Sequence, residues 1–555
     1  MIAERDTAIL GRLMLAFRGV TVPAWLRARL AAAPVAGFTL FRPLNVRSPR
    51  QVRALTGALQ ATARAPRRAP GAPAAATATS QASERLPILI AVDQEGGQLL
   101  ALGDGWTPFG GPMAIGAAGD AGLAERVGRA VGRELRAVGV NVDYAPCLDV
   151  ASNPANPSLG IRSFGDDPAA VGALGAAWLR GLQSAGVAGT MKHFPGKGEG
   201  SVDTHLQLAV VERDRAGLDA VELAPFRAAV EAGVRLTMSG HFAVPAVTGS
   251  RSLPSTLAPA VMTGLLRDEL GFEGISITDA LDMGALPQDA TQAVDVIAAL
   301  RAGVDLLLAT SGRAAQRRIE ASIVRAAQLG LLDPGSVARS AARIEDLRRW
   351  IASFDAPPLE VVGCAEHAAL ARELAERSIT LVRNDARLLP LRLPAGARIV
   401  AIEPRPFDLT PADTSSYLAP GLAAALRAHH DGVEEILVEP DPPAGEIAAV
   451  GTAIRGRDLV VVATDAGTFR PRQATLVRAA LGTGVPVVTV ALRTPFDLAE
   501  YPGAATHACT YGRHRPSIDA IAAALFGRIP FPGRLPAAIP GLFPTGHGLG
   551  VAGAG

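Results

Sequence analysis

The sequence predicts an α/β protein with an N-terminal (β/α)8 barrel of the TIM type and a C-terminal α/β sandwich domain that has a mostly parallel sheet. Three observations support this fold class. The 555 residues are too many for one ordinary hydrophobic core. From the N-terminus, short apolar runs alternate with longer amphipathic runs, as in βα units around a parallel sheet. The same alternation begins again after a proline-containing break at 355–358.

The short apolar runs of the first part supply the strands of the barrel. Amphipathic runs at 123–138, 167–184, 216–232 and 259–269 are typical of helices between them. Eight strands are enough to close a barrel. We predict them at 12–17, 37–41, 87–93, 141–150, 188–193, 236–242, 274–279 and 304–309.

Residues 61–84 interrupt this alternation. The segment is rich in Ala, Pro, Arg, Thr and Ser and has no periodicity, so we predict a flexible insertion before the third strand. The barrel domain is then expected at 1–354, with its insertion at 61–84.

A linker at 355–370 and a second domain at 371–555 follow. The helical run 367–378 leads into further helices at 472–481 and 516–526, with five strands at 398–402, 435–438, 458–464, 485–492 and 506–511. Five strands with crossovers indicate an open doubly wound sheet. No strand here is followed by a GxGxxG run that opens a helix, which argues against a dinucleotide-using enzyme.

Composition excludes several kinds of partner. A net charge of +2 and 4% aromatic residues give no reason to expect nucleic acid or an anionic membrane. The three scattered cysteines, Cys147, Cys364 and Cys509, suggest a reducing compartment. The charged N-terminus, Met1 to Asp6, does not resemble a secretory signal, and no window is apolar enough to span a membrane. We therefore expect a cytoplasmic location.

The segment from Met191 to His205 is the most informative stretch of the chain. It is polar and glycine-rich, yet it follows directly on a predicted buried strand, and loops in that position carry the reactive groups of α/β proteins. The only lysines of the chain, Lys192 and Lys197, lie in it, although Arg supplies the positive charge elsewhere. Barrel enzymes place their active sites at the C-terminal ends of the strands. Six polar residues fall at or just after predicted strand ends: Asp93, Asp149, Lys192, His193, His241 and Asp279.

These residues can be assigned chemical roles. An imidazole such as that of His205 can give and take a proton near neutral pH, and the Asp203 carboxylate can fix its tautomer. Asp279 ends an apolar strand and could act as a nucleophile toward an anomeric carbon, or it could cap a helix, a role for which Asp282 is better placed. Asp93 suits sugar hydroxyls, and Glu95 could be structural. No HExxH or Cys/His spacing exists and a lysine adjoins the candidate ligands, so we expect no metal and no other cofactor.

The run from Lys192 to Gly196, with Gly198 and the Asp203-Thr204-His205 triplet, resembles the signature of the β-N-acetylglucosaminidase type of glycoside hydrolase family 3. Further matches run in the same order: 93–97, 145–149 with 162–165, 239–241, 278–283, 378–384 with 388–390, and 533–536. The resemblance implies Asp279 as the nucleophile, His205 as the acid/base and Asp203 as its partner. It also implies that substrate is bound by Asp93, Arg162, Lys192 and His193.

The implied function is a retaining exo-β-N-acetylglucosaminidase with a small carbohydrate substrate, in cell-wall peptidoglycan recycling. The chain departs from the family where Lys197 replaces a usual histidine and where Gln98 and Ala101 stand in place of usual arginines. The alternatives are a β-glucosidase, a phosphorylase that uses phosphate in place of water, and a sugar-binding protein with reduced catalysis. The sequence leaves the oligomeric state open.

Overall fold

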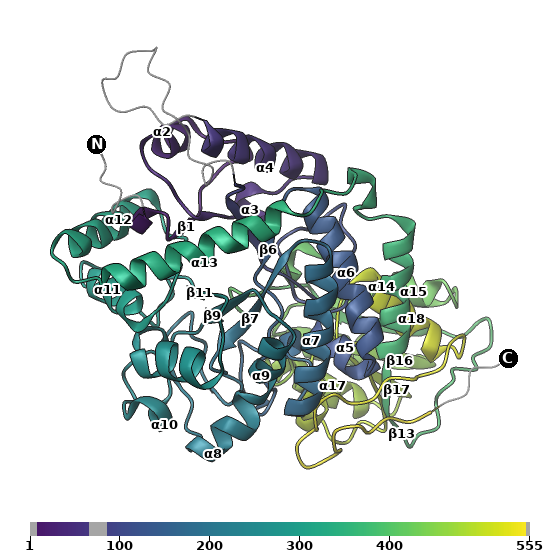
Figure 1. Cartoon of the computed structure of the whole chain (residues 1–555). Helices are drawn as coiled ribbons and strands as arrows, with labels where there is room; N and C mark the ends of the chain where they lie inside the picture. Colours follow the sequence, from purple (N-terminus) through teal and green to yellow (C-terminus); the bar gives the residue numbers. More distant parts are fainter. Residues whose placement is uncertain (1–7, 66–85, 551–555) are drawn as a thin grey trace.

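The computed structural model describes residues 8–65 and 86–550. Its first part is the predicted barrel of parallel strands (Figure 1), whose order is β11-β9-β7-β6-β3-β2-β1-β12. A parallel bridge between Ile277 and Leu306 links the two ends of this order, so the sheet closes on itself. The strands are β1 (Leu13–Leu15), β2 (Gly37–Thr39), β3 (Leu89–Val92), β6 (Val142–Asp143), β7 (Ala188–Phe194), β9 (Leu236–Ser239), β11 (Ile275–Thr278) and β12 (Leu307–Ala309).

Each of these strands falls within or overlaps one of the eight predicted apolar runs. All but β7 are shorter than predicted. The strand residues are buried, as parallel strands covered on both faces must be. The predicted barrel fold is therefore confirmed.

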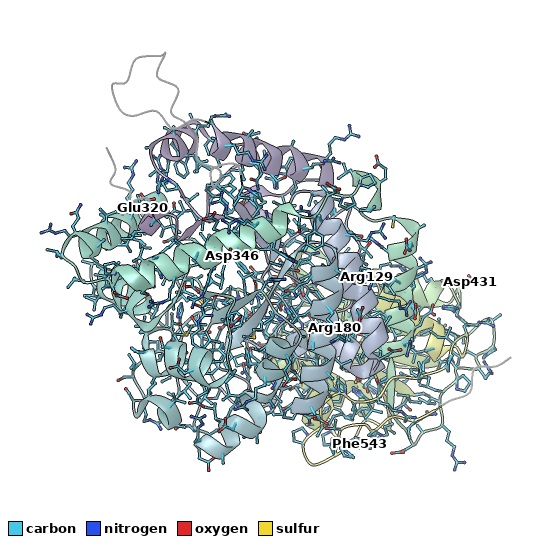
Figure 2. The ribbon with its side chains drawn as sticks, in the orientation of Figure 1. Arg129, Arg180, Glu320, Asp346, Asp431 and Phe543 are labelled. Carbon is cyan, nitrogen blue, oxygen red and sulfur yellow. The ribbon has the colours of Figure 1, made fainter. Side chains whose placement is uncertain are left out.

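Helices cover the barrel, and two of the longest, α6 (Ala121–Ala137) and α7 (Pro168–Ser184), each begin after a capping aspartate. The Asp120 side chain accepts a bond from the Leu123 amide at the start of α6, and Asp167 caps α7, which has proline at its first position. These two helices pack closely because a Cβ at Gly128 or Gly181 would meet backbone oxygens of the other helix at 2.1 and 2.0 Å. On the outer surface, Arg129 and Arg180 lie near each other on the two helices (Figure 2).

The remaining helical segments of the barrel domain lie between its strands or follow the last one. They are α2 (Ala24–Ala32), α3 (Arg42–Asn45), α4 (Pro49–Arg64), α5 (Pro112–Ala118), η2 (Gly160–Arg162), α8 (Arg215–Gly217), η3 (Leu218–Glu222), α9 (Ala224–Glu231), α10 (Pro245–Thr248), η4 (Ser255–Leu257), η5 (Ala260–Glu269), α11 (Gln292–Ala302), α12 (Arg313–Gln328) and α13 (Pro334–Ala352). Helix α4 extends to Arg64, into the first residues of the predicted insertion. The rest of that insertion, from residue 66, lies outside the described residues.

The second domain contains a six-stranded sheet in the order β13-β18-β17-β16-β14-β15. Five strands are parallel, as predicted: β14 (Ile399–Pro404), β15 (Val433–Val438), β16 (Leu459–Thr464), β17 (Val487–Ala491) and β18 (Thr506–Cys509). The sixth, β13 (Thr380–Asn384), pairs antiparallel with β18 at the edge and was not among the predicted strands. The sheet is thus mostly parallel.

Five helices accompany this sheet: α14 (Ala365–Ser378), α15 (Leu422–Arg427), α16 (Ala444–Ala453), α17 (Pro471–Leu481) and α18 (Arg515–Leu525). Helix α14 begins at Ala365, inside the predicted linker, and lies against the barrel helices α5 and α6. One hydrophobic cluster contains buried residues of both domains. Within residues 8–65 and 86–550, no helix has the length and apolar character needed to cross a membrane.

Candidate active site

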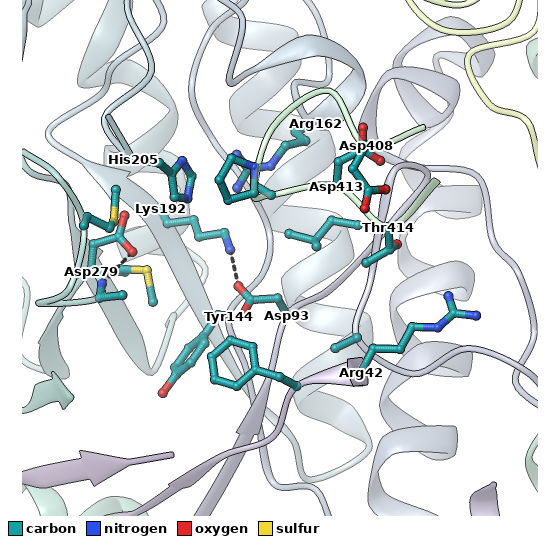
Figure 3. A pocket seen from close by; sticks show the side chains of 18 of the residues that line it. Arg42, Asp93, Tyr144, Arg162, Lys192, His205, Asp279, Asp408, Asp413 and Thr414 are labelled. Atoms are coloured by element: carbon teal, nitrogen blue, oxygen red, sulfur yellow. Dashed lines mark hydrogen bonds and ion pairs between the residues drawn. The ribbon is translucent and has the colours of Figure 1, made fainter. Parts of the chain in front are cut away.

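A pocket of about 330 Å³ lies where the barrel strands end, at the boundary between the two domains (Figure 3). Its volume is at the small end of the range of ligand sites. The barrel contributes most of the wall, namely Phe41, Arg42, Pro43, Asp93, Leu99, Ala101, Tyr144, Arg162, Lys192, His193, His205, Met238, Asp279, Ala280, Met283 and Leu308. The second domain contributes Asp408, Pro411, Ala412, Asp413, Thr414 and Tyr417. The pocket thus lies where barrel enzymes place their chemistry.

A cluster of paired charges forms one side of the pocket. Lys192 Nζ lies 2.8 Å from Asp93 Oδ1 and 2.6 Å from Glu95 Oε1. Arg162 donates from its Nε and a terminal nitrogen to the two Glu95 oxygens, each at 2.8 Å. Burial would raise the pKa of Glu95, but Arg162 and Lys192 outweigh it and hold that pKa below its usual range. Glu95 is therefore a structural anion that positions two cations.

Asp93 remains the acceptor that faces the pocket in this cluster. Burial raises its pKa, against the opposing effect of the Lys192 ammonium. For Lys192, burial would lower the pKa, but Asp93 and Glu95 together raise it. An ammonium and a carboxylate side by side offer both a donor and an acceptor to sugar hydroxyls.

His193 is held by Asp149, which follows β6. Its Nδ1 lies 2.7 Å from Asp149 Oδ2, and the Lys197 amide donates to Asp149 Oδ1 at 2.9 Å. Burial lowers the pKa of His193 to about 4, so the ring is neutral at pH 7. Burial would raise the pKa of Asp149, but His193 and Lys197 lower it to about 2. The pair fixes the His193 ring with Nε2 toward Asp279, 4.0 Å away.

Asp149 and His193 also form, with Cys147, a group whose potential metal-ligand atoms lie within 4.8 Å of one another. The Cys147 thiol donates to Asp149 Oδ2 at 3.3 Å, and burial raises the pKa of that thiol well above its usual value. A thiol must lose its proton to bind a metal. The group is therefore better explained as a hydrogen-bonded cluster, and the absence of a metal stays a prediction.

Asp279 follows β11 directly. Its Oδ1 accepts a bond from the Ala280 amide at 2.8 Å, which leaves Oδ2 toward the pocket. Burial would raise the pKa of Asp279, but His193, His241 and Lys197 outweigh it and hold that pKa below its usual range. Asp279 is thus an anion throughout the neutral range, as a nucleophile must be.

Asp279 begins no helix, and neither does Asp282. The sequence placed Asp282 at a helix cap, which is wrong: α11 begins at Gln292, and Asp282 instead accepts a bond from the Thr310 hydroxyl. The segment between β11 and α11 is therefore longer than it would be if Asp282 capped the helix.

Asp203 and His205 lie together on the loop after β7. His205 Nδ1 lies 2.6 Å from Asp203 Oδ1, and the same oxygen accepts the His205 amide at 3.0 Å. Burial would raise the pKa of Asp203, but its bond to His205 lowers it. The His205 carbonyl in turn accepts the Gly284 amide at 2.9 Å, which ties this loop to the turn after Asp279. With Nδ1 bound to Asp203, His205 has Nε2 available for proton transfer in the pocket.

The structure brings the predicted site residues together. The pocket is lined by six of them, namely Asp93, Arg162, Lys192, His193, His205 and Asp279. The seventh, Asp203, does not line the pocket but is hydrogen-bonded to His205 Nδ1. Arg162 is less available than predicted, because its guanidinium is shared between Glu95 and the Ser158 carbonyl.

Sequence reasoning missed several contributors. Tyr144 had no motif of its own, Met283 ends the matched run 278–283 but was given no role, and Arg42 follows the end of β2. The second-domain wall follows β14, so the rule that functional groups gather at strand ends could have found it if extended to the second sheet.

Comparison with known proteins identifies the family. Residues 57–347 match the model of the glycosyl hydrolase family 3 N-terminal domain. The chain belongs to this family. It is 30% identical over 481 residues to a β-N-acetylglucosaminidase/β-glucosidase of Cellulomonas fimi, an alignment that covers 81% of this chain and 83% of that protein. Family membership makes the chain a glycoside hydrolase by class, and the pocket is its candidate active site.

Two further relatives extend the comparison. β-Hexosaminidase A of Pseudoalteromonas piscicida is 35% identical over 401 residues, which cover 67% of this chain and 63% of that longer protein. The solved structure of a family 3 β-N-acetylglucosaminidase from Paenibacillus sp. str. FPU-7 is similar to this one, with a TM-score of 0.87 and 32% identity. That match covers 97% of this chain and 99% of the other, so the two-domain arrangement is shared.

Proposed function

We propose that this glycoside hydrolase is a retaining exo-β-N-acetylglucosaminidase, with Asp279 as nucleophile and His205, held by Asp203, as acid/base. The observation that carries the proposal is the placement of both groups in one pocket, on two segments joined by the bond from Gly284 to His205. Relatives named for β-N-acetylglucosaminidase or β-hexosaminidase activity support the same substrate class.

The proposed mechanism has two displacement steps. In the first, Asp279 Oδ2 attacks the anomeric carbon while His205 Nε2 gives its proton to the leaving oxygen, so that a glycosyl ester forms as the glycosidic bond breaks. In the second, His205 takes a proton from water, whose oxygen displaces Asp279 and restores the anomeric configuration. Asp203 supports the charge that His205 carries before the first step and again after the second, when both ring nitrogens hold a proton.

The polar cluster would hold the sugar in place during both steps. Asp93 and Lys192 offer paired acceptor and donor groups, and Arg162 and His193 border them. These four residues are the proposed substrate-binding set. Since Arg162 is already shared with Glu95, we assign most of the hydroxyl binding to Asp93 and Lys192.

The biological setting we propose is recycling of peptidoglycan fragments in the cytoplasm. It rests on the motif from Lys192 to His205 and its resemblance to the β-N-acetylglucosaminidase type. A β-glucosidase is the second candidate, because the Cellulomonas fimi relative is named for both activities. A phosphorylase is the third, because Lys197 lies near Asp279 and an ammonium there would favour an anionic acceptor.

The test is release of a chromophore from an aryl β-N-acetylglucosaminide and from the aryl β-glucoside, each with and without phosphate. We expect selective cleavage of the N-acetyl substrate without phosphate, with the β-anomer as first product by NMR. Asp279→Asn should lose about 10⁴-fold or more in kcat, and His205→Ala about 10²- to 10⁴-fold.

Asp282→Asn is the matched control for Asp279→Asn, because Asp282 is an exposed acid on the same turn. It should keep native activity. Release of the α-anomer first, or an Asp279→Asn enzyme as active as Asp282→Asn, would contradict the mechanism. Formation of glucosyl phosphate or N-acetylglucosaminyl phosphate would show that the enzyme is a phosphorylase and not a hydrolase.

A further inference from the structure

The second domain contributes one continuous stretch to the pocket, residues 408–417, which we name the closing segment. Figure 3 shows its residues Asp408, Asp413 and Thr414 on the far side of Asp93 and Lys192 from Asp279 and His205. The two proposed reacting groups thus lie at one end of the pocket and the closing segment at the other.

The closing segment is hydrogen-bonded to the barrel at this far end. The Thr414 amide donates to the Gln98 carbonyl at 2.8 Å, and the Leu100 amide donates to Thr414 Oγ1 at 3.1 Å. The Gln98 side chain donates to the Ala412 carbonyl at 3.3 Å. The stretch from Gln98 to Leu100 thus holds the closing segment.

A second anchor lies in the sheet of the second domain. Asp413 pairs with Arg493, whose Nε donates to Asp465 Oδ1 at 2.8 Å. Arg513 joins Asp465 to Glu403 at 2.6 and 2.9 Å. All of these side chains are buried. They occupy the carboxyl ends of β14, β16, β17 and β18, where open α/β sheets commonly bind ligands. Here that crevice holds the chain's own charges and fixes the closing segment.

A third contact lies at the rim of the pocket. The Arg42 guanidinium stacks over the Tyr417 ring at 4.2 Å, and a Cβ at Gly103 would meet that guanidinium at 2.3 Å. Arg42 is therefore enclosed between the Gly103 backbone and the second domain. Together the three contacts make the far wall of the pocket a fixed surface.

We propose that the closing segment is the stop that limits this enzyme to a single sugar on the non-reducing side of the cleaved bond. The inference rests on the proposed function. In a pyranose ring C4 lies opposite C1, so a sugar whose C1 faces Asp279 directs O4 toward the far wall. A second β-1,4-linked sugar would have to pass through the closing segment. The position of this segment, rather than the barrel alone, thus makes the action exo.

Binding to the native protein gives a first test that does not depend on turnover. Calorimetric titration should show binding of N-acetylglucosamine and a loss of about tenfold to a hundredfold in affinity for its 4-O-methyl derivative, because an added group would overpack a fixed wall. Equal affinity for the two sugars would overturn the proposal, whether or not the protein cleaves any glycoside.

A deletion tests which element forms the stop. The Leu409 amide lies 2.9 Å from Asp413 Oδ2, so the chain on either side of residues 410–412 is close together, and their deletion keeps both Asp413 and Thr414. With an aryl β-chitobioside, the native enzyme should release N-acetylglucosamine first and the aryl group only after a lag. The deletion variant should release the intact disaccharide and the aryl group together.

A filling variant covers the case in which the deletion does not fold. Ala412→Phe should lower kcat/KM for the aryl β-N-acetylglucosaminide by about tenfold to a hundredfold, mainly through KM. Ala419→Phe is its matched control, because Ala419 is exposed two residues after the closing segment and does not line the pocket.

The outcomes separate the two proposals. A native enzyme that cleaves the monosaccharide substrate and also frees disaccharide supports the proposed function but overturns the stop. A native protein that binds N-acetylglucosamine, rejects the 4-O-methyl sugar and cleaves nothing overturns the function but supports the stop. A folded deletion variant that still frees only the monosaccharide, or equal KM values for the Ala412→Phe and Ala419→Phe enzymes, would also overturn the stop.

Discussion

Glu95 holds in place two side chains of the proposed substrate-binding set, Arg162 and Lys192. Its side chain is fully buried and pairs with Arg162 and Lys192, the two cations that border Asp93. Removing one member of a buried ionic group leaves the others without compensation, which costs more than the pair itself contributes. The two buried cations therefore depend on Glu95 for charge compensation.

Glu95→Gln should lower the free energy of unfolding by about 3–5 kcal/mol, because Lys192 and Arg162 keep their charges in a buried setting. Urea unfolding of the native and variant proteins measures the difference. Glu212→Gln is the control, since Glu212 pairs with Arg251 on the surface and should cost less than about 1 kcal/mol. Equal losses for the two variants would mean that the buried cluster is no stronger than a surface pair.

Asp143, at the end of β6, is a buried acid of a different kind. Its Oδ1 accepts the Gln94 amide at 2.9 Å, and among the described atoms its Oδ2 has no hydrogen-bond partner. Burial raises the pKa of Asp143 to about 8, so the carboxyl is protonated at pH 7. A raised pKa means stability that is complete below the unfolded pKa, near 4, and is lost as pH rises through 8.

Asp143→Asn should remove this loss, because an amide does not titrate. The unfolding free energy of the variant minus that of the native protein should rise by up to about 1.4 kcal/mol per pH unit between pH 4 and pH 8, and then level off. Urea unfolding at pH 5, 6, 7 and 8 provides the measurement. A difference that does not change with pH would show that Asp143 ionises normally in the folded protein.

At the scale of elements, the loop that carries His205 depends on a close approach to the segment after β6. A Cβ at Gly198 would lie 1.8 Å from the Val150 carbonyl oxygen, a backbone atom that no side-chain rotation can move. The loop must therefore shift if this glycine is replaced.

Gly198→Ala should lower kcat on the aryl β-N-acetylglucosaminide by about tenfold or more, because a displacement of about 1 Å at a reacting group is costly. Gly57→Ala is the control: an added Cβ at Gly57, in α4, would meet no described atom within 4 Å beyond its own helix, and Ala should be neutral or stabilising there. Equal activity of the two variants would show that the loop tolerates the shift.

The elements were largely predictable from the sequence. The barrel strands are continuous apolar runs that end in polar residues, and both features are local. The edge strand β13 was missed because it is antiparallel and partly exposed at Arg383 and Asn384, so its apolar run is shorter than those of β14 and β16. The turn around Asp282 was misjudged because a lone acid before a helical pattern is typical of a cap, whether or not the helix begins there.

The candidate site also has one part that the sequence predicts and one part that it does not. Asp279 and the Asp203–His205 pair lie in motifs whose order along the chain can be read directly. The Glu95 cluster, the support of His193 by Asp149 and the wall from 408 to 417 depend on which strand ends meet in space, and no local pattern encodes that.

At the scale of the whole molecule, α14 joins the two domains. Its Leu374 belongs to the cluster shared with the barrel, and its Ala375 to the core of the second domain. Domains that share a large hydrophobic interface are not expected to move or unfold independently.

The chain should therefore unfold in a single calorimetric transition, and Leu374→Ala should move that transition to lower temperature without splitting it. The loss should be about 2–5 kcal/mol, because Leu374 is fully buried. Leu331→Ala, at an exposed position, should change stability by less than about 0.5 kcal/mol. Two separate transitions in the native protein would contradict the shared core.

The contact between Gln98 and Thr414 has a consequence for how such enzymes diversify. Its shortest hydrogen bond joins two main-chain groups, so the neighbouring side chains of the closing segment are free to change. New specificities could then arise by exchange of a few residues in the second domain, while the barrel that breaks the bond is left untouched. If the proposed stop holds, engineering of the second domain alone would change the length of substrate that the pocket accepts.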